Sequence, residues 1–337
     1  NAGATASTTS PEAATAYFDF PYYVTQLTWT SPVTNKLLFE AGFTRFSYYH
    51  GGGPGQVPPD GILNIGVTEL STVGGRVPRA NYAYRAVSQY NDNYGNPNNW
   101  RASASYVTGA HNMKVGYQGQ FLRADSHIIS NPSTLSYTFN QGVPQSFGFR
   151  MLDWYQTDRT STAALFIQDT WTRGRLTLQG ALRYDRAWSW SPAEGNGTPT
   201  TGPTNAAPIT FERTASVDAF NDLTPRFGLA YDVFGNGKTA IKFNMGHYLD
   251  SATNDSAYTR NNPATRIARG AAGVVTRNWQ DTNNNRIVDC DLLNFGLQTA
   301  VDTCAALGGD NLNFGKTGAN LDQINQDTLR GWGVREH

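Results

Sequence analysis

Alternation of apolar and polar side chains is the feature that most limits how this chain can fold. The stretch NDLTPRFGLAYDVFGNGKTAIKFNMGHY, residues 221–248, places Phe227 and Leu229 on one face of an extended strand and Arg226 and Asp232 on the other. The pattern resumes after a turn that contains Gly and Asn. Because the side chains of a strand point alternately to its two faces, this period predicts a β-hairpin with one apolar and one polar side. Helical periodicity is nearly absent from the rest of the chain, so we expect an all-β protein.

Three more hairpins are expected from the same pattern. The four predicted strand pairs are 22–30 with 36–49, 100–109 with 112–125, 162–172 with 175–190, and 223–234 with 238–249. Strands of roughly 9 to 14 residues are longer than the five or six usual in globular sheets, and they suit a tilted membrane crossing. We therefore expect an antiparallel, up-and-down transmembrane β-barrel, or part of one, with about eight long strands.

The connections between the predicted strands differ in length at the two ends of the sheet. Turns within hairpins are short, whereas the hairpins are joined by long segments at 50–99, 126–161 and 191–222, and another begins at 250. Short periplasmic turns and long extracellular loops are typical of outer-membrane barrels. We interpret 1–337 as a single partial barrel domain, with an extended N-terminal segment at 1–20 and a long extracellular loop region at 250–337.

The apolar face could meet lipid, or it could fill the core of a soluble β-sandwich. Strand length and loop asymmetry favour lipid. The residues expected to face lipid are Phe39, Phe43, Val115, Leu178, Leu182, Phe227, Leu229 and Phe243. The residues expected to line the lumen are Arg183, Asp185, Arg226, Asp232, Lys242 and Asn244. Two roles stay open for the lumen charges: contact with a ligand or plug, or structural ion pairs.

Large aromatic residues flank the apolar stretches at both ends. Trp29 and Trp171 lie next to short turns, while Trp188 and Trp190 lie where a strand runs into a long loop. Trp and Tyr are enriched at both membrane–water interfaces, so this placement is typical of strands that cross a membrane. Asp169 departs from the pattern because it shares the parity of apolar neighbours, which indicates either a charge near an interface or a β-bulge.

Composition excludes several classes of function. The charges balance, with 26 basic and 26 acidic residues and no basic run, so nucleic acid is not an expected partner. No grouping of Ser, His and Asp or other catalytic motif is present, so we do not expect an enzyme. No apolar run approaches the roughly 20 residues of a transmembrane helix. The N-terminal stretch has no secretory signal, which indicates a leader already removed or a chain that begins within a longer protein.

One polar segment near the C-terminal end carries two candidate features. Cys290 and Cys304 flank a short polar loop; they form a disulfide in an oxidising compartment or remain unrelated free thiols. In DTNNNRIVDCD, oxygen-bearing residues alternate like the ligands of a calcium loop. The candidate calcium ligands are Asp281, Asn283, Asn285, Ile287 (through its carbonyl) and Asp289. The alternative is a loop of Asx-turns in which these side chains bond their own backbone.

Several motifs resemble a known family. The segments ALFIQDTWTRGRLTLQGALRYD and PRFGLAYDVFGNGKTAIKFNMGHY resemble consecutive hairpins in the barrels of TonB-dependent outer-membrane receptors. HNMKVGYQGQF and WQDTNNNRIVDCDLLN are similar to the Oar-like branch, whose members carry a carboxypeptidase-regulatory-like domain before the plug. The resemblance covers most of 20–335. It implies a 22-stranded barrel in the bacterial outer membrane, a plug domain, and uptake of a scarce ligand with energy from TonB.

The chain departs from that family pattern in two ways. We find about eight strands and neither a plug nor a TonB-contacting segment, and the sequence ends in LRGWGVREH rather than in a terminal aromatic strand. We therefore expect a barrel segment of a receptor whose long loops bind an extracellular ligand. The rival hypothesis is a structural or adhesive surface barrel without transport.

Overall fold

The computed structural model describes residues 9–19, 22–54, 64–70, 81–130, 134–150, 154–195, 209–253, 258–264, 274–314 and 335–336. These residues form strands almost throughout. The helical elements whose bounds are described are short 3-10 turns, η1 (Pro11–Ala13) and η5 (Gly309–Asn313). Within the described residues, no helix has the length and apolar character needed to cross a membrane.

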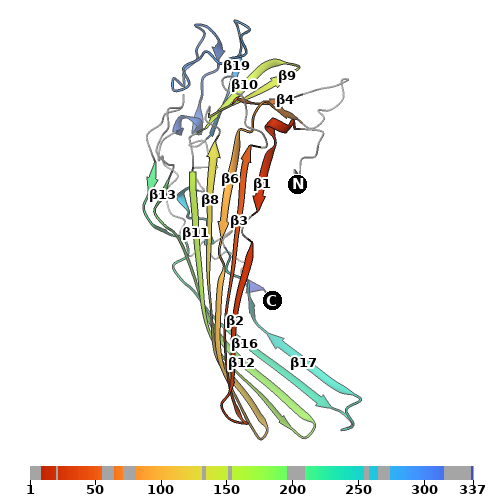
Figure 1. The fold of residues 1–337 in the computed structure, drawn as a ribbon. Coiled ribbons are helices and arrows are strands. Elements are labelled where there is room, and N and C mark those ends of the chain that lie inside the picture. The colour runs from red at the N-terminus through yellow and green to blue at the C-terminus, as the bar shows by residue number, and fades with distance from the viewer. Residues whose placement is uncertain are drawn as a thin grey trace.

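One curved antiparallel sheet makes up most of the structure (Figure 1). It consists of β1 (Thr15–Asp19), β2 (Tyr23–Pro32), β3 (Leu37–Pro54), β6 (Gln89–Gly95), β7 (Asn98–Thr108), β8 (His111–Ser130), β11 (Trp154–Arg173), β12 (Leu176–Ser191), β15 (Thr214–Ala215), β16 (Phe220–Asp232) and β17 (Ala240–Gly246). Each strand pairs with neighbours in chain order. β1 and β2 pair with successive parts of β3, and β6 and β7 do the same between β3 and β8. The sheet thus has the expected up-and-down order of eight strand positions.

The central strands are longer than predicted. β8 and β11 each contain 20 residues, and their pairing runs without a break from Trp171↔His111 to Trp154↔Ile128. Parts of 126–161 that the sequence indicated as loop are therefore strand. Polar residues are frequent in these upper halves, and the hydrophobic pattern that predicts a half-buried strand is weak there.

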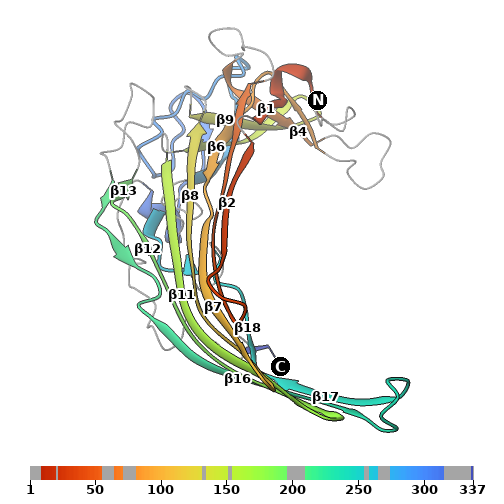
Figure 2. The same cartoon turned by 60° about the horizontal axis from the view of Figure 1, so that its bottom comes forward.

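The predicted long loops fold into a second sheet, which we call the cap. It contains β4 (Gly66–Glu69), β5 (Tyr82–Tyr84), β9 (Leu135–Asn140), β10 (Val143–Arg150), β19 (Val274–Gln280) and β20 (Thr303–Cys304). The pairing is antiparallel except between β4 and β9. Two-stranded ribbons join β13 (Glu194–Gly195) to β14 (Thr210–Phe211) and β18 (Tyr248–Leu249) to β21 (Arg335–Glu336). The cap lies at the end of the curved sheet opposite the short turns (Figure 2).

The short turns between β7 and β8, β11 and β12, and β16 and β17 depend on glycine and on one aspartate. Gly109, Gly174, Gly235 and Gly237 all have positive φ, a conformation that side chains with a Cβ rarely adopt. In the last turn, the carboxylate of Asp232 accepts hydrogen bonds from the backbone N–H groups of Gly235 (3.0 Å) and Gly237 (2.9 Å). The turn chemistry therefore fixes the hairpin register at this end of the sheet.

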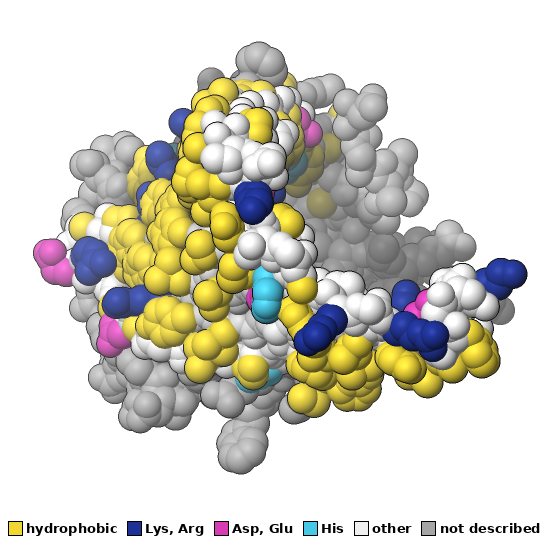
Figure 3. Space-filling view, turned by 90° about the horizontal axis from the view of Figure 1, so that it is seen from below, with side chains coloured by type: hydrophobic (Ala, Val, Ile, Leu, Met, Phe, Trp, Pro, Cys, Tyr) yellow, Lys and Arg dark blue, Asp and Glu magenta, His cyan; other side chains and the backbone are white. Residues whose placement is uncertain are grey.

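Most of the buried core lies in the cap; the barrel strands contribute Trp154 at the upper end of β11 and Phe220 at the start of β16. Tyr137, Phe139, Phe147 and Phe149 are each at most 1% exposed and form a cluster with the cap residues Val275 and Trp279. On the barrel sheet, large apolar side chains lie on the convex face and stay exposed. Seen from the short-turn end, hydrophobic side chains form a band around the outside of the curve (Figure 3). This distribution is the reverse of a soluble sandwich, in which the apolar faces would pack against each other.

Glycines on the long strands make room for large rings from the neighbouring strand. A Cβ on Gly119 would overlap the Trp100 ring, and a Cβ on Gly116 would overlap the Phe166 ring. Both pairs are direct cross-strand neighbours. Packing of aromatic side chains over cross-strand glycines pins the register of a sheet.

Candidate functional site

The residues expected to face lipid share one face of the barrel sheet. Phe39, Val115, Leu182, Phe227 and Phe243 are exposed, and Phe43, Leu178 and Leu229 are half-buried. The register joins them into rows across strands: Leu178 pairs with Leu229, which pairs with Phe243. None of these eight belongs to either buried cluster. These rows of paired apolar side chains form a continuous apolar surface, which is what contact with a bilayer requires.

The tryptophans bracket this surface. Trp29 and Trp171 lie near the short turns, and Trp188 and Trp190 lie near the upper end of β12. The ten residue steps from Leu178 to Trp188 span about 25 Å along the membrane normal, at about 3.3 Å per step and a tilt of about 40°. That height matches the apolar band of an outer-membrane barrel.

Asp169 lies on the outer face without a bulge, because the pairing of β11 with both neighbours is continuous there. Its Oδ2 lies 2.6 Å from Nδ1 of His111, which begins β8 at the short-turn end. Of the two explanations that the sequence left open, the continuous pairing excludes the bulge, and a charge near an interface stays the prediction. A polar partner at that level reduces the cost of placing a carboxylate beside lipid.

Five of the six residues expected to line the lumen border neighbouring cavities. Arg183, Asp185 and Arg226 line one cavity of about 270 Å³, and Lys242 and Asn244 line another of about 190 Å³. Arg226 and Asn244 also line a cavity of about 280 Å³ together. Asp232 instead closes the short turn described above. Arg183 pairs with Asp185 at 2.8 Å, and the Arg226 guanidinium lies 4.4 Å from the Tyr248 ring centroid. These contacts are structural ion-pair and cation–π contacts of the inner wall.

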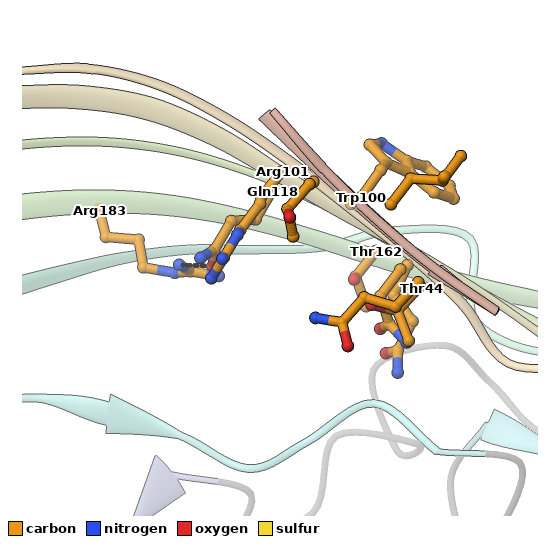
Figure 4. Close-up of a pocket in the computed structure, with 13 residues that line it drawn as sticks. Thr44, Trp100, Arg101, Gln118, Thr162 and Arg183 are labelled. Carbon is orange, nitrogen blue, oxygen red and sulfur yellow. Dashed lines mark hydrogen bonds between the residues drawn. The ribbon is translucent and has the colours of Figure 1, made fainter. Parts of the chain in front are cut away.

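A polar groove of about 410 Å³ runs across the same concave face from β2 to β12. Arg183 and Gln118 converge with Arg101 at one end of the groove (Figure 4), and the Arg183 Nη1 donates to Gln118 Oε1 at 2.6 Å. The remaining inward groups are mostly neutral hydroxyls and amides, from Gln26, Thr28, Thr44, Asn99, Gln120 and Thr162. Sequence reasoning did not single out Arg101, although its alternation within 100–109 places it on the polar face.

A second polar cluster, which we call the junction, lies where β11 extends beyond its neighbour β12. Their pairing ends at Arg159↔Trp190, so the next part of the β11 edge needs other partners. The Glu194 carboxylate accepts hydrogen bonds from Thr157 N–H (2.6 Å) and Thr157 Oγ1 (2.7 Å). Asn262 Nδ2 donates to the Thr157 carbonyl (3.1 Å) and to Asp158 Oδ1 (2.8 Å). The junction thus ties the segments around 194 and 262 to one barrel strand.

Burial makes the junction sensitive to pH. Desolvation raises the pKa of Glu194 to about 7, against the lowering effect of its bonds from Thr157, and desolvation also raises the pKa of Asp158. We compare the folded state with an opened state, in which the junction contacts are broken and Glu194 is exposed to water. Below pH 4.5 Glu194 is protonated in both states. As pH rises from 4.5 to 7, the folded state retains a proton that the opened state releases. The junction therefore loses stability over that window, by about 3 kcal/mol once pH exceeds 7.

We expect Glu194→Gln to remove most of this pH dependence. The amide oxygen can still accept both bonds from Thr157, but no charge develops at high pH. At pH 8, hydrogen exchange of the Thr157 amide should slow on the order of a hundredfold relative to wild type, and at pH 4.5 the two proteins should match. The exposed Glu212→Gln change serves as the control and should have no effect. Equal exchange in Glu194→Gln and wild type at pH 8 would contradict the assignment.

A disulfide and a buried arginine hold the cap together. Cys290 and Cys304 are joined by a disulfide. Arg277 on β19 is 1% exposed, and its guanidinium donates to the carbonyls of Ala305 (2.9 Å), Asn294 (2.9 Å) and Gly296 (2.8 Å). Sequence reasoning missed Arg277, which shares a strand face with the buried Val275 and Trp279.

The candidate calcium residues lie in one turn before the disulfide, and one side-chain oxygen each of Asp281, Asn283, Asn285 and Asp289 accepts a hydrogen bond within that turn, whereas Asp281 Oδ1 is buried without a partner. Asp281 Oδ2 accepts from Arg286 N–H (2.8 Å), Asn283 Oδ1 from Asn285 N–H (3.1 Å) and Asn285 Oδ1 from Ile287 N–H (2.7 Å). Asp289 Oδ2 accepts from the amide nitrogens of Asn283 and Asn285. Among the described residues, no cluster of three or more His, Cys, Asp or Glu side chains is placed to hold a metal. These contacts are those of the Asx-turn alternative, and calcium binding stays a prediction.

Comparison with known proteins identifies the family. Residues 1–317 match the family described as outer membrane beta barrel domain. The chain belongs to this outer-membrane β-barrel family. Membership places the protein in the bacterial outer membrane, in contact with its lipid, and confirms the all-β barrel fold class and the localisation predicted from the sequence.

Among curated proteins, no significant match was found. Among solved structures, the chain is similar to the outer membrane transporter YddB from Escherichia coli, with 13% sequence identity and a TM-score of 0.43. The match covers 77% of this barrel chain and 29% of the YddB chain, so the chain spans less than a third of that transporter's length.

Proposed function

We propose that this chain is the barrel part of an Oar-like, TonB-dependent outer-membrane receptor that takes up an extracellular ligand without catalysing a reaction. The cap would contact the ligand first, the lumen would hold a plug domain, and TonB would supply the energy. The motifs shared with that branch support the proposal at the level of sequence. The observation that supports it most is the polar groove on the concave face (Figure 4).

The groove has the chemistry of a surface that binds and releases a polar solute. Its neutral hydroxyls and amides offer donors and acceptors, and they lack the large desolvation penalty of buried charges. Arg101 and Arg183 add two positive charges, of which Arg183 is already paired with Asp185. Arg101 therefore leaves positive charge at one end of the groove, which favours a ligand with an anionic group.

The proposal is tested by uptake in the bacterium that carries the protein. Compounds that disappear from the medium are compared by mass spectrometry in wild-type cells, in cells lacking this protein and in cells lacking TonB. We expect one compound or compound class to remain in the medium in both deletion strains. Complementation with Arg101→Ala should reduce its uptake several-fold at unchanged surface abundance, while the short-turn change Arg173→Ala should not.

Other outcomes separate the rival role from the proposed one. If the strain lacking the protein consumes every compound as wild type does, yet loses attachment or cell–cell adhesion, the chain is an adhesive barrel and the transport proposal is wrong. If uptake depends on the protein but not on TonB, the chain is a passive pore.

A further inference from the structure

Four arginines lie near the upper tryptophans: Arg123 on β8, Arg159 on β11, Arg186 on β12 and Arg213, which directly precedes β15. The first three share the strand parity of the outward residues, and Arg213 lies over Trp190. Arg123 and Arg159 are direct neighbours across β8 and β11, and both pair with one carboxylate, that of Asp125, at 2.5 Å. Arg186 and Arg213 differ, because within the described residues neither makes an ion pair. The outer rim of the sheet therefore carries positive charge that the described side chains leave uncompensated.

Each of these two arginines lies over a tryptophan. The Arg186 guanidinium is 5.6 Å from the Trp188 ring centroid, and the Arg213 guanidinium is 5.4 Å from that of Trp190. Trp188 and Trp190 are successive outward residues of β12, about 7 Å apart along the strand. Stacking on aromatic rings leaves the edge of a guanidinium, with its N–H donors, free to bind an anion.

The depth of these groups in the membrane restricts the partner. The band from Leu178 to Trp188 places Trp188 at the upper interface, and Arg186 lies two residues below it on the lipid-facing side. A charge at that depth is tolerated when its side chain extends toward the headgroups, which is the direction of Trp188. The anions available at this level on the outside of a barrel are the phosphates of outer-leaflet lipids.

We propose that Arg186 and Arg213, held over Trp188 and Trp190, form a binding site for the phosphate groups of an anionic outer-leaflet glycolipid. This site is separate from the concave groove and does not depend on what the barrel transports. It would fix the barrel at one depth and anchor the β12–β15 corner beneath the cap. The binding mode combines charge-assisted hydrogen bonds to phosphate with packing of the acyl region against the apolar band.

The test uses the full chain in detergent micelles, titrated with diphosphoryl lipid A and with its dephosphorylated form and followed by native mass spectrometry. We expect the phosphorylated lipid to bind about tenfold tighter or more. The double variant Arg186→Ala/Arg213→Ala should lose this preference. Arg173→Ala, which removes an exposed arginine at the short-turn end of the same hairpin, should keep it. Heat-modified migration on gels checks that all variants are folded.

Three results would overturn the proposal. The first is equal binding of the two lipid forms by wild type, and the second is an unchanged preference in the double variant. The third is full competition by inorganic phosphate at concentrations comparable with the lipid, because the site would then recognise a free anion rather than a lipid.

Discussion

Replacement of Arg277 by Met is expected to destabilise the cap by about 3 kcal/mol, because several buried carbonyl oxygens would lose a donor at once. Arg277 is 1% exposed, and its guanidinium donates to the carbonyls of Asn294 and Gly296, which lie between the disulfide-linked cysteines, and of Ala305, which follows Cys304. Methionine fills similar volume but donates no hydrogen bond. Hydrogen exchange of the β19 amides should therefore accelerate on the order of a hundredfold.

The exposed Arg286 provides the matched control for this change. Arg286→Met removes the same charge from the same segment and should leave β19 exchange within a factor of about two, as is usual for surface substitutions. The barrel strands below the cap should keep their protection in both variants, because only the upper ends of β8 and β11, at Ile128 and Trp154, reach the buried cluster of the cap. Cap protection that survives Arg277→Met unchanged would show that the carbonyl network contributes little.

An arginine at Ile167 is expected to destabilise the folded barrel in lipid by about 2–4 kcal/mol, as for charges placed near the bilayer midplane of other barrels. Ile167 is 59% exposed, pairs with Val115 and Leu182, and lies near the middle of the apolar band. The neighbouring Gln168→Arg change places the same charge on the concave face and should cost less than about 1 kcal/mol. Folding titrations in urea, with vesicles of short-chain phosphatidylcholine, measure both free energies.

Because Ile167 and Gln168 are adjacent but point to opposite faces, the difference between their two free-energy losses tests which face contacts lipid. If the outer face contacted protein rather than lipid, local packing alone would determine the loss of folding free energy for each substitution. A larger loss at Gln168 than at Ile167 would contradict the assignment of faces.

The barrel strands could be predicted from the sequence because their pattern is local. In 223–249 and 175–190 apolar residues occupy most alternate positions of each strand, and short glycine turns fix the ends. This periodicity can be recognised within a single strand, without information about residues that are distant in sequence. The resulting assignment of Phe227, Leu229 and Phe243 to one face agrees with the pairing register of the structure.

The cap could not be predicted because its order comes from contacts that are distant in sequence. β4 pairs in parallel with β9, and β10 pairs with β19 more than a hundred residues later. Its strands are short and interrupted by turns, so their periodicity is weak. Glu194 is a similar case: nothing around it in the sequence signals that it caps the exposed edge of β11 at Thr157.

Among the candidate site residues, the predictions that rested on alternation grouped side chains as the pairing register does, but they did not reveal how each side chain is used. Asp232 shares the parity of the inward residues and yet binds the backbone of its own turn. Arg101, which the alternation places inward, was overlooked because a single charge among Ser and Ala gives no motif. Which charges converge depends on strand register, and register is set by pairing across the sheet.

The most direct test of the lipid-facing assignment is the accessibility of spin labels at adjacent residues. Single cysteines at Ile167 and Gln168 can be labelled selectively because Cys290 and Cys304 are joined to each other. In phospholipid vesicles, we predict that a nitroxide at 167 collides mainly with dissolved oxygen, which concentrates in lipid, and that a nitroxide at 168 collides mainly with a water-soluble nickel chelate. The same relation should hold for 243 and 244. Preferential collision with the nickel chelate at both 167 and 243 would show that the apolar face meets water or protein, and the account of this barrel would be wrong.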